Sequence, residues 1–439
     1  MKKCFLRSAT TLALFGLASI PVATLAAPLT FEQTVELAVQ YNAALRNARA
    51  NAAAAEQRVR AAYSGFLPQV SGDVTYVDRS GSALPSVTAT TAYSTSVTVT
   101  QNLFAGYQDQ ARVEQGAANV DLAQAALALA KAQLSRDLKT AFAGLSYAQD
   151  SVVLTEDILR RLEENLRLVE LRFEGGRENK GSLLLSQASV AQGRFERLQA
   201  RQALASAQAQ LAAAIGLAAP FGGANTANPH VPDYTVPDLR ALGTVFLIAP
   251  SAVPDYAALV RGAPELRDVI ARERSAGADL RLARAGFYPS VSVSGSIGRD
   301  GSTWFPNQDS RVLSANVSIP LYSGGRDYYG ERGALAALDA VKANRENVEG
   351  QILVRLKQSY AAYVESVEQL TVARAFVTAA QTRATIARAR YENGLISFED
   401  WDRIENELTQ RRKALLLSQR DRVSAEAAWE SVQGKGVIP

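Results

Sequence analysis

Residue types that carry out chemistry are scarce in this sequence. Its 439 residues contain one cysteine, Cys4, and one histidine, His230. A single imidazole cannot form a multi-histidine metal site, and the prolines around His230 are typical of a solvated loop. No nucleophile is paired with a base, and the glycine-rich runs 176–182 and 295–301 lack the spacing of phosphate or dinucleotide loops. We therefore expect no catalytic residue, no metal and no cofactor.

Residues 1–26 predict a secretory signal peptide. Three basic residues precede an apolar run, 12–26, that is too short to span a bilayer as a stable helix. Cleavage after Ala26 would remove Cys4, which excludes thiol catalysis, cysteine-bound zinc and disulfides. The remaining chain has 44 Lys and Arg against 43 Asp and Glu. The high pI of the whole sequence therefore does not indicate a nucleic-acid partner.

The placement of proline indicates where long helices can form. The tracts 86–219 and 321–438 contain no proline, whereas seven of the fifteen prolines fall within 220–264. Proline inside a helix costs about 3 kcal/mol, so the proline-free tracts permit very long helices. Apolar residues spaced by three and four predict coiled-coil seams along them. The expected helices are about 108–173, 182–215, 327–391 and 398–432, with a proline-rich, irregular connector at 220–254 and a tail at 434–439.

Four other segments alternate with a period of two. Val97 and Val99, for example, lie between Ser96, Thr98 and Thr100. Apolar residues on one face and Ser, Thr or Asn on the other are typical of a membrane-spanning strand, and equally of an ordinary antiparallel sheet with one wet face. The expected strands are about 69–79, 91–101, 289–299 and 311–320.

The order helix, strand, strand, long helix, glycine turn, long helix occurs twice, at 27–219 and 255–433. Three motifs recur, the first at an offset of 221 residues and the others at 218. They are Gly65-Phe66-Leu67-Pro68 with Gly286-Phe287-Tyr288-Pro289, Leu103-Phe104-Ala105-Gly106 with Leu321-Tyr322-Ser323-Gly324, and Arg172-Phe173-Glu174-Gly175-Gly176 with Arg390-Tyr391-Glu392-Asn393-Gly394. The offset changes between the paired strands, where a loop tolerates insertions. The sequence therefore predicts a duplicated structural unit.

The number of predicted strands limits what one chain can build. Four strands cannot close a membrane barrel, which needs about eight, and open edges in lipid would leave backbone groups unsatisfied. If the strands span a membrane, several chains must share one barrel. Helices of roughly 100 Å are too long for a bilayer and must project into water beside it. A barrel continued by a tube of helices would be a conduit.

The doubled motifs resemble those of the TolC family of outer-membrane channels, over about 29–432. The resemblance implies an α+β membrane protein, a homotrimer with a 12-stranded β-barrel in the outer membrane that continues as an α-helical barrel in the periplasm. It implies the exit duct of a tripartite efflux or type I secretion system for small molecules or proteins. The implied partners are outer-membrane lipid, a periplasmic adaptor, and an inner-membrane pump of the RND, ABC or MFS type, with no nucleic acid.

The resemblance also implies a constriction at the periplasmic end of the tunnel. The residues assigned to it are Asp400, Glu399, Asp402 and Tyr391. Three copies of Asp400 around a threefold axis would favour cations. The turn residues Gly175, Gly176, Arg177, Asn393, Gly394 and Leu395 would contact the adaptor. Phe66, Pro68, Phe287 and Pro289 would lead into the strand pairs, and Leu103, Gly106, Leu321 and Gly324 would lead out of them.

Asp400 has a second interpretation, because the run from Ser397 to Asp400 also resembles a capping box. Acidic residues favour helix N-termini by roughly 0.3–1 kcal/mol whatever else they do. The equivalent position in the first copy is Ser182, and Arg403 stands where relatives carry a second acid. At both positions the sequence departs from the acidic pattern of the family.

A periplasmic coiled-coil adaptor or scaffold is the main alternative. An adaptor would carry one helical hairpin between split β domains, usually with a membrane anchor, whereas this sequence predicts two hairpins and two strand pairs. An exported enzyme is the third possibility, and the lack of a nucleophile–base pair or metal cluster argues against it.

Overall fold

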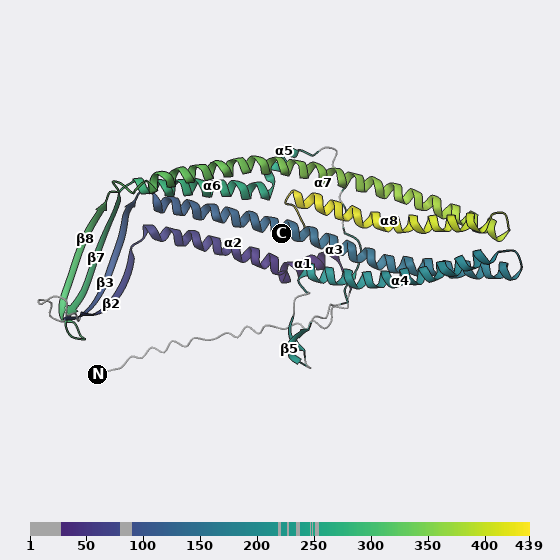
Figure 1. Ribbon diagram of the computed structural model, residues 1–439, viewed down its shortest axis with the longest axis horizontal. Coiled ribbons are helices and arrows are strands. Elements are labelled where there is room, and N and C mark those ends of the chain that lie inside the picture. Colours follow the sequence, from purple (N-terminus) through teal and green to yellow (C-terminus); the bar gives the residue numbers. More distant parts are fainter. Residues whose placement is uncertain are drawn as a thin grey trace, which may run out of the picture.

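The chain is strongly elongated, with a β-sheet at one end and two helical turns at the other (Figure 1). The computed structural model describes residues 28–79, 90–217, 221–225, 228–233, 238–245, 247, 249–250 and 254–439, so the expected signal peptide lies outside the described residues. Within these ranges, no helix combines the length and apolar character needed to cross a membrane.

Both halves of the chain have the same order of elements. The first half contains α1 (Phe31–Tyr41), α2 (Ala43–Ala62), β2 (Gln69–Arg79), β3 (Thr90–Ala105), α3 (Gln108–Glu174) and α4 (Lys180–Ile215). The second half contains α5 (Tyr256–Gly262), α6 (Pro264–Arg284), β7 (Ser290–Gly301), β8 (Gln308–Ser318), α7 (Arg326–Glu392) and α8 (Phe398–Val432). Short 3-10 turns, η2 (Tyr63–Phe66) and η3 (Ala285–Phe287), precede β2 and β7.

The observed bounds lie within a few residues of the expected ones. The largest difference is at β3, which runs to Ala105 where the sequence predicts an end at 101. The strand continues because Gln101 to Ala105 still pair with β7, across a bulge between Asn102 and Phe104. The division into a signal peptide and two repeats remains a prediction.

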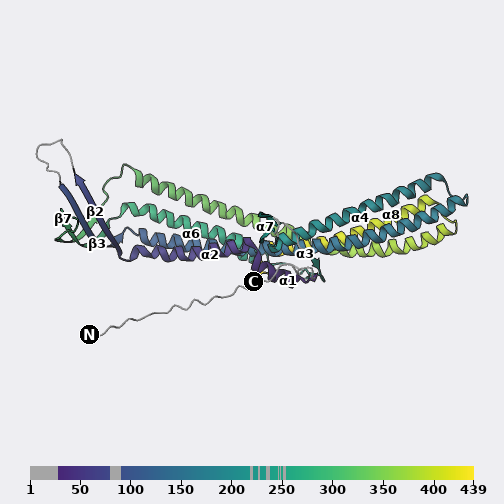
Figure 2. The ribbon, with the colours of Figure 1, turned by 90° about the horizontal axis from the view of Figure 1, so that it is seen from below.

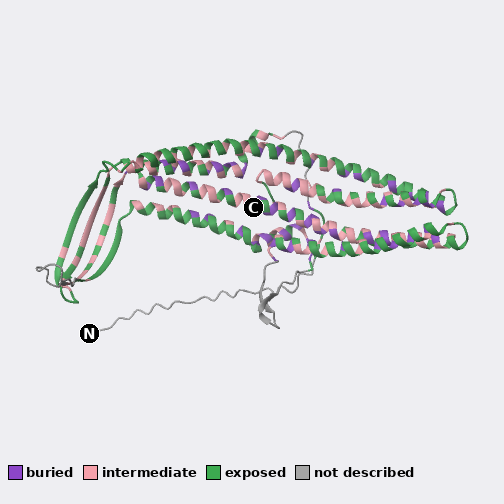
Figure 3. Cartoon of the chain, viewed as in Figure 1, coloured by how far each residue is buried: buried purple, intermediate pink, exposed green. Residues whose placement is uncertain are grey.

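The four main strands form one antiparallel sheet in the order β2-β3-β7-β8. The register places apolar residues in rows on one face, such as Val70, Val99, Gly295 and Leu313. The other face carries polar rows, such as Gln69, Thr100, Ser294 and Ser314. No described helix covers either face, and most of the sheet is exposed or half-buried (Figure 3). The sheet thus has one apolar face, one hydroxyl-rich face and two open edges, β2 and β8.

The helices form two successive sections along the long axis of the molecule, one near the sheet and one in the far half. α3 and α7 run through both, with α2 and α6 beside them near the sheet and α4 and α8 beside them in the far half (Figures 1 and 2). Alanine recurs every seven residues on the buried side of α3 near the sheet, at Ala111, Ala118, Ala125 and Ala132. Small side chains at this interval allow neighbouring helices to approach closely along a coiled-coil seam.

Larger apolar residues fill the middle of the molecule, where both ends of the first half and the C-terminal end of the second half pack together. Phe31 of α1 packs edge-on against Phe142 of α3, with ring centroids 5.5 Å apart. The segment expected to be an irregular connector is partly extended: β6 (Arg240–Ala241) pairs with β1 (Pro28–Leu29), and β4 (Phe221–Asn225) pairs with β5 (Asn228–Asp233). The irregular expectation is wrong for these residues, because extended segments satisfy their backbone groups by pairing.

We expect Lys139→Ala to destabilise the protein strongly. Lys139 of α3 is 3% exposed, and its Nζ lies 2.7 Å from Glu430 Oε2 and 3.5 Å from Glu426 Oε1 of α8. Removing the lysine takes away the ammonium group that both carboxylates contact in a buried site, at a cost of about 3–5 kcal/mol. Thermal unfolding in detergent measures the loss. Arg136→Ala breaks an exposed pair one turn away and should change stability by less than about 1 kcal/mol; equal losses in both variants would contradict this expectation.

Candidate functional site

The two turns at the far end have the same backbone geometry. In each, the glycine N–H bonds the carbonyl three residues back, Gly176 to Phe173 at 3.0 Å and Gly394 to Tyr391 at 2.9 Å. The next N–H reaches five residues back, from Arg177 and from Leu395, at 2.8 Å in both turns. This pair of bonds is the Schellman motif, which needs a left-handed residue; Gly176 has φ +68° and Gly394 has φ +73°. The repeated glycine turn therefore has a direct backbone cause.

The helices that follow the turns are capped alike. Asn179 Oδ1 accepts the N–H of Ser182 at 2.9 Å, and Ser397 Oγ accepts the N–H of Asp400 at 3.1 Å. Ser182 and Asp400 thus occupy the same helical position in the two copies. The Asp400 carboxylate accepts from the Ser397 hydroxyl at 3.2 Å and from Arg403 at 2.9 Å. Asp400 therefore takes part in a cap, and Arg403 neutralises it on the same helix.

An aromatic cluster of the second hairpin packs against the first hairpin just inside the turns. Tyr391 at the end of α7 is fully buried and stacks on Trp401 of α8, with centroids 4.3 Å apart and planes 11° from parallel. Phe398 meets both rings at an angle. Val169 of α3 completes the cluster. Because Phe173, the counterpart of Tyr391 in the first copy, stays 37% exposed, the duplicated tip is asymmetric.

Polar contacts to Tyr391 also come from the first hairpin. Its hydroxyl donates to Glu178 Oε2 at 2.8 Å. Arg172 lies over its ring, 4.4 Å from the centroid, and donates to its carbonyl oxygen at 2.6 Å. Burial raises the pKa of Tyr391 and the neighbouring Glu178 carboxylate raises it further, so the hydroxyl remains a proton donor at neutral pH. The cation–π contact and the hydrogen bonds thus hold the second hairpin against the first, while the stacking on Trp401 fixes the Tyr391 ring within the second hairpin.

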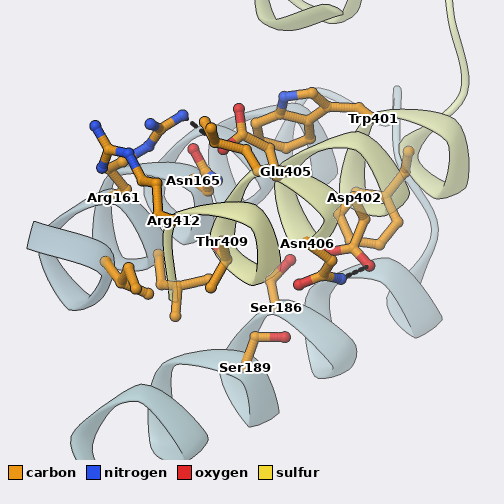
Figure 4. Close-up of a pocket in the computed structure, with 14 residues that line it drawn as sticks. Arg161, Asn165, Ser186, Ser189, Trp401, Asp402, Glu405, Asn406, Thr409 and Arg412 are labelled. Atoms are coloured by element: carbon orange, nitrogen blue, oxygen red, sulfur yellow. Dashed lines mark hydrogen bonds and ion pairs between the residues drawn. The ribbon is translucent and has the colours of Figure 1, made fainter. Parts of the chain in front are cut away.

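The predicted acidic cluster is divided between two environments. Glu399 and Asp400 are exposed. Asp402 instead lines a small cavity of about 30 Å³ between α3, α4 and α8, where it accepts from Asn406 at 3.0 Å (Figure 4). Burial raises the pKa of Asp402. Positions 400 and 402 lie about 200° apart around a helix, so the structure does not bring these two acids together.

Glu405 adds a further acid to this cavity. It is 8% exposed and accepts from Arg161 of α3 at 2.7 Å (Figure 4). Burial raises the pKa of Glu405, and the Arg161 guanidinium opposes that rise. The cavity has room for water and not for a cargo molecule. It is part of the hairpin packing and not a substrate pocket.

The glycines of the motifs next to the strands are needed because two segments of the chain pass close to each other there. A Cβ on Gly65 would lie 2.5 Å from Asp109 Oδ1, and one on Gly286 would lie 2.9 Å from Asp327 Oδ1. In both copies the chain before the first strand therefore crosses directly over the first turn of the long helix. Gly106 and Gly324 lie between the second strand and the long helix of each copy, and their φ angles are +61° and +68°. The exposed apolar residues in these segments include Phe66, Leu103, Phe287 and Leu321. Pro68 and Pro289 directly precede the paired residues of β2 and β7.

Sequence reasoning missed Glu178, Arg172 and Trp401. Arg172 belongs to a repeated motif, but its partner Tyr391 lies more than two hundred residues away in the chain. Glu178 and Trp401 correspond to Ile396 and Leu183 in the other copy. The signal that could have identified these residues is a difference in charge or ring size between equivalent positions of the two copies. A contact that joins the two copies asymmetrically requires different residues at equivalent positions.

A sheet with one apolar and one hydroxyl-rich face, extended by long helical hairpins, defines a subunit of an outer-membrane channel with a tunnel. The model of the outer membrane efflux protein family matches residues 34–217 and 256–435, so the chain belongs to that family. It is an outer-membrane protein with a large periplasmic part, and the family is one of transport proteins. Because the match covers both repeats, the adaptor alternative is not supported.

The curated relatives are distant. The alkaline protease secretion protein AprF of Pseudomonas aeruginosa is 23% identical over 310 residues, which cover 67% of this chain and 61% of AprF. The nickel and cobalt resistance protein CnrC of Cupriavidus metallidurans is 24% identical over 334 residues, 76% of this chain and 71% of CnrC. The solved structure of CusC has a TM-score of 0.80 at 18% identity, over 92% of each chain. The likeness to CusC concerns the fold.

Proposed function

We propose that three copies of this chain form one outer-membrane channel, which is the exit duct of a tripartite efflux or type I secretion system. The channel acts as a passive conduit for small molecules or proteins and not as an enzyme. The observation that carries the proposal is the four-stranded sheet with an apolar face and two open edges. In lipid, the unpaired backbone groups of such edges cost several kcal/mol each, roughly, and further copies can pair them. Three chains then supply twelve strands.

The helical part has matching open edges. Packing partners of α4 include α3 and α1, and those of α7 include α8 and α6. Both α4 and α7 carry exposed apolar residues, including Phe195, 53% exposed, and Phe376, which is 47% exposed and lies beside Arg411 of α8. Phe195 lies 15 residues after the start of α4 and Phe376 lies 16 before the end of α7. Both are thus roughly 23 Å from the tip, a depth at which α4 of one copy can pack on α7 of the next.

The exposed turns are suited to contact a periplasmic adaptor. Gly175, Gly176, Arg177, Asn393, Gly394 and Leu395 are all exposed, and Leu395 is 73% exposed. Inside the turns, the contacts of Tyr391 with Glu178 and Arg172 hold the hairpins together. We assign the resting, closed state of the tunnel to these contacts, and its opening to their loss when the adaptor and its inner-membrane pump dock.

Planar-bilayer recording of the purified protein tests the proposed function. We expect a trimer by native mass spectrometry and single-channel steps after insertion into a bilayer. A monomer that inserts without conducting, or a trimer that never inserts, would rule out the channel. A stable soluble protein from the periplasmic fraction would do the same.

We expect Asp400→Ala to lower the cation selectivity of the channel and its conductance for cations. Asp400 is 55% exposed beside the tip, and its removal deletes one negative charge per subunit from the proposed aperture. Ser397→Ala is the control for a merely helix-capping role, because it removes the hydroxyl that caps the Asp400 N–H and keeps the Asp400 charge. Unchanged conductance and selectivity in Asp400→Ala, or the same change in Ser397→Ala, would remove Asp400 from the aperture.

A further inference from the structure

The apolar face of the β7–β8 hairpin carries three charged residues near its loop. Along β8, Leu313, Ala315 and Val317 share this face, and the register continues it to Arg311 and Asp309. Along β7, Ile297 is followed on the same face by Arg299. Charged residues on a face that is otherwise apolar require a partner that the lipid tails do not offer.

The depth of these residues places them near the outer surface of the membrane. Tyr76, Tyr93 and Trp304 form an aromatic group toward the loop end of the sheet, with ring centroids 5.0 and 5.5 Å apart, typical of the interface girdle of a membrane sheet. Tyr93 pairs with Gly301, so Arg299 lies two residues inside the group and Arg311, opposite Ile297, lies four. With strands tilted by about 40°, Arg311 lies roughly 10 Å below the girdle.

The charges within the group do not balance. Arg299 Nε lies 3.1 Å from Asp309 Oδ1, which pairs one arginine with the one acid. Arg311 has no carboxylate within ion-pair distance among the described residues. A long arginine side chain can extend its guanidinium toward the headgroups while its stem stays among apolar neighbours. The group therefore presents one uncompensated positive charge, with a second guanidinium beside it, on the lipid side of the sheet.

We propose that Arg299 and Arg311 bind the phosphate of a phosphorylated lipid headgroup in the outer leaflet. Planar guanidinium groups bind phosphate oxygens through paired hydrogen bonds, and two of them on neighbouring strands can share one phosphate. Asp309 sets the strength of the site, because it competes with the phosphate for Arg299. The bound lipid would fix the height of the hairpin in the membrane. This inference rests on the proposed function, which places the sheet in the outer membrane.

The test uses the purified trimer and two lipids, bisphosphorylated lipid A and its dephosphorylated form, with binding followed by native mass spectrometry. We expect the phosphorylated lipid to bind at least about tenfold more tightly. Arg299→Gln combined with Arg311→Gln should abolish this preference. Asp309→Asn should strengthen binding, a direction that general damage to the sheet would not produce. Arg326→Gln, an exposed arginine at the opposite end of the sheet, is the control and should bind as the unaltered protein does.

Several outcomes would overturn the inference. Equal binding of the two lipids by the unaltered protein does so without any variant, so it holds even if the double variant fails to fold. Displacement by inorganic phosphate would assign the site to free phosphate instead. If the double variant no longer forms the trimer but still prefers the phosphorylated lipid, Arg311 pairs instead with an acid of the next copy, such as Asp78 on the β2 edge. A conducting trimer without a lipid preference removes only this inference, whereas the absence of any conducting trimer removes the proposed function as well.

Discussion

Tyr391→Phe and Glu178→Ala are each expected to raise the resting conductance of the channel several-fold. The Tyr391 hydroxyl donates to the Glu178 carboxylate at 2.8 Å and is the polar contact that runs from the second hairpin to the first turn. A hydrogen bond to a charged group contributes about 1.5–3 kcal/mol, so its loss in one subunit shifts an open–closed equilibrium by about tenfold or more. Planar-bilayer recording of the open fraction without adaptor or pump measures the shift.

A double-mutant cycle shows whether the two residues act as a pair. If they do, the variant with both changes should conduct no more than the stronger single variant, because each change already removes the whole bond. Glu174→Ala is a matched control, since Glu174 is an exposed acid one turn earlier on the same hairpin. Strict additivity of the two effects, or a rise of equal size in Glu174→Ala, would show that the Tyr391–Glu178 bond does not hold the tip closed.

The long elements could be predicted because their causes are local. α8 spans 398–432 and β2 spans 69–79, the same residues as in the prediction. Helix bounds follow from proline-free tracts and from the glycine turns, and the strands follow from strict alternation of apolar and hydroxyl residues. Both signals are repeated in the second copy, so each half of the sequence checks the other. The four-stranded sheet also limits what a single chain can do alone.

The contacts at the tip could not be predicted because their causes are not local: they join residues that are far apart in the chain. Tyr391 was expected at the constriction, but its partner Glu178 lies 213 positions away in the chain. The two residues are not equivalent positions of the duplicated unit, so the repeat does not indicate that they meet. Likewise Asp400 and Asp402 look like one acidic cluster in sequence, yet the helix directs one to solvent and the other into the cavity beside Asn406. Sequence proximity on a helix is a poor guide to shared surroundings.

Phe195→Glu is expected to prevent assembly of the trimer. Leu184, Ala188, Ala191, Phe195 and Leu198 repeat at steps of four and three along α4 and are all exposed. This stripe lies opposite the side of α4 on which Gly193 approaches Leu162 of α3, so it is available to another copy. A charge buried in such a seam would lack a partner and cost several kcal/mol, roughly, in each of three interfaces. Native mass spectrometry and heat-dependent gel migration should both show monomer.

A charge pair across the seam provides the decisive comparison. If α4 of one copy packs on α7 of the next at equal depth, Phe195→Glu combined with Phe376→Lys should recover part of the trimer that either change alone abolishes, because the two charges then neutralise each other. Phe195→Leu keeps the apolar contact and should assemble normally. Gln187→Glu adds the same charge on the flank of α4 and should also assemble. A trimer in Phe195→Glu would show that this stripe faces solvent in the channel, and the ring would then have to close through other helical faces and the strand edges.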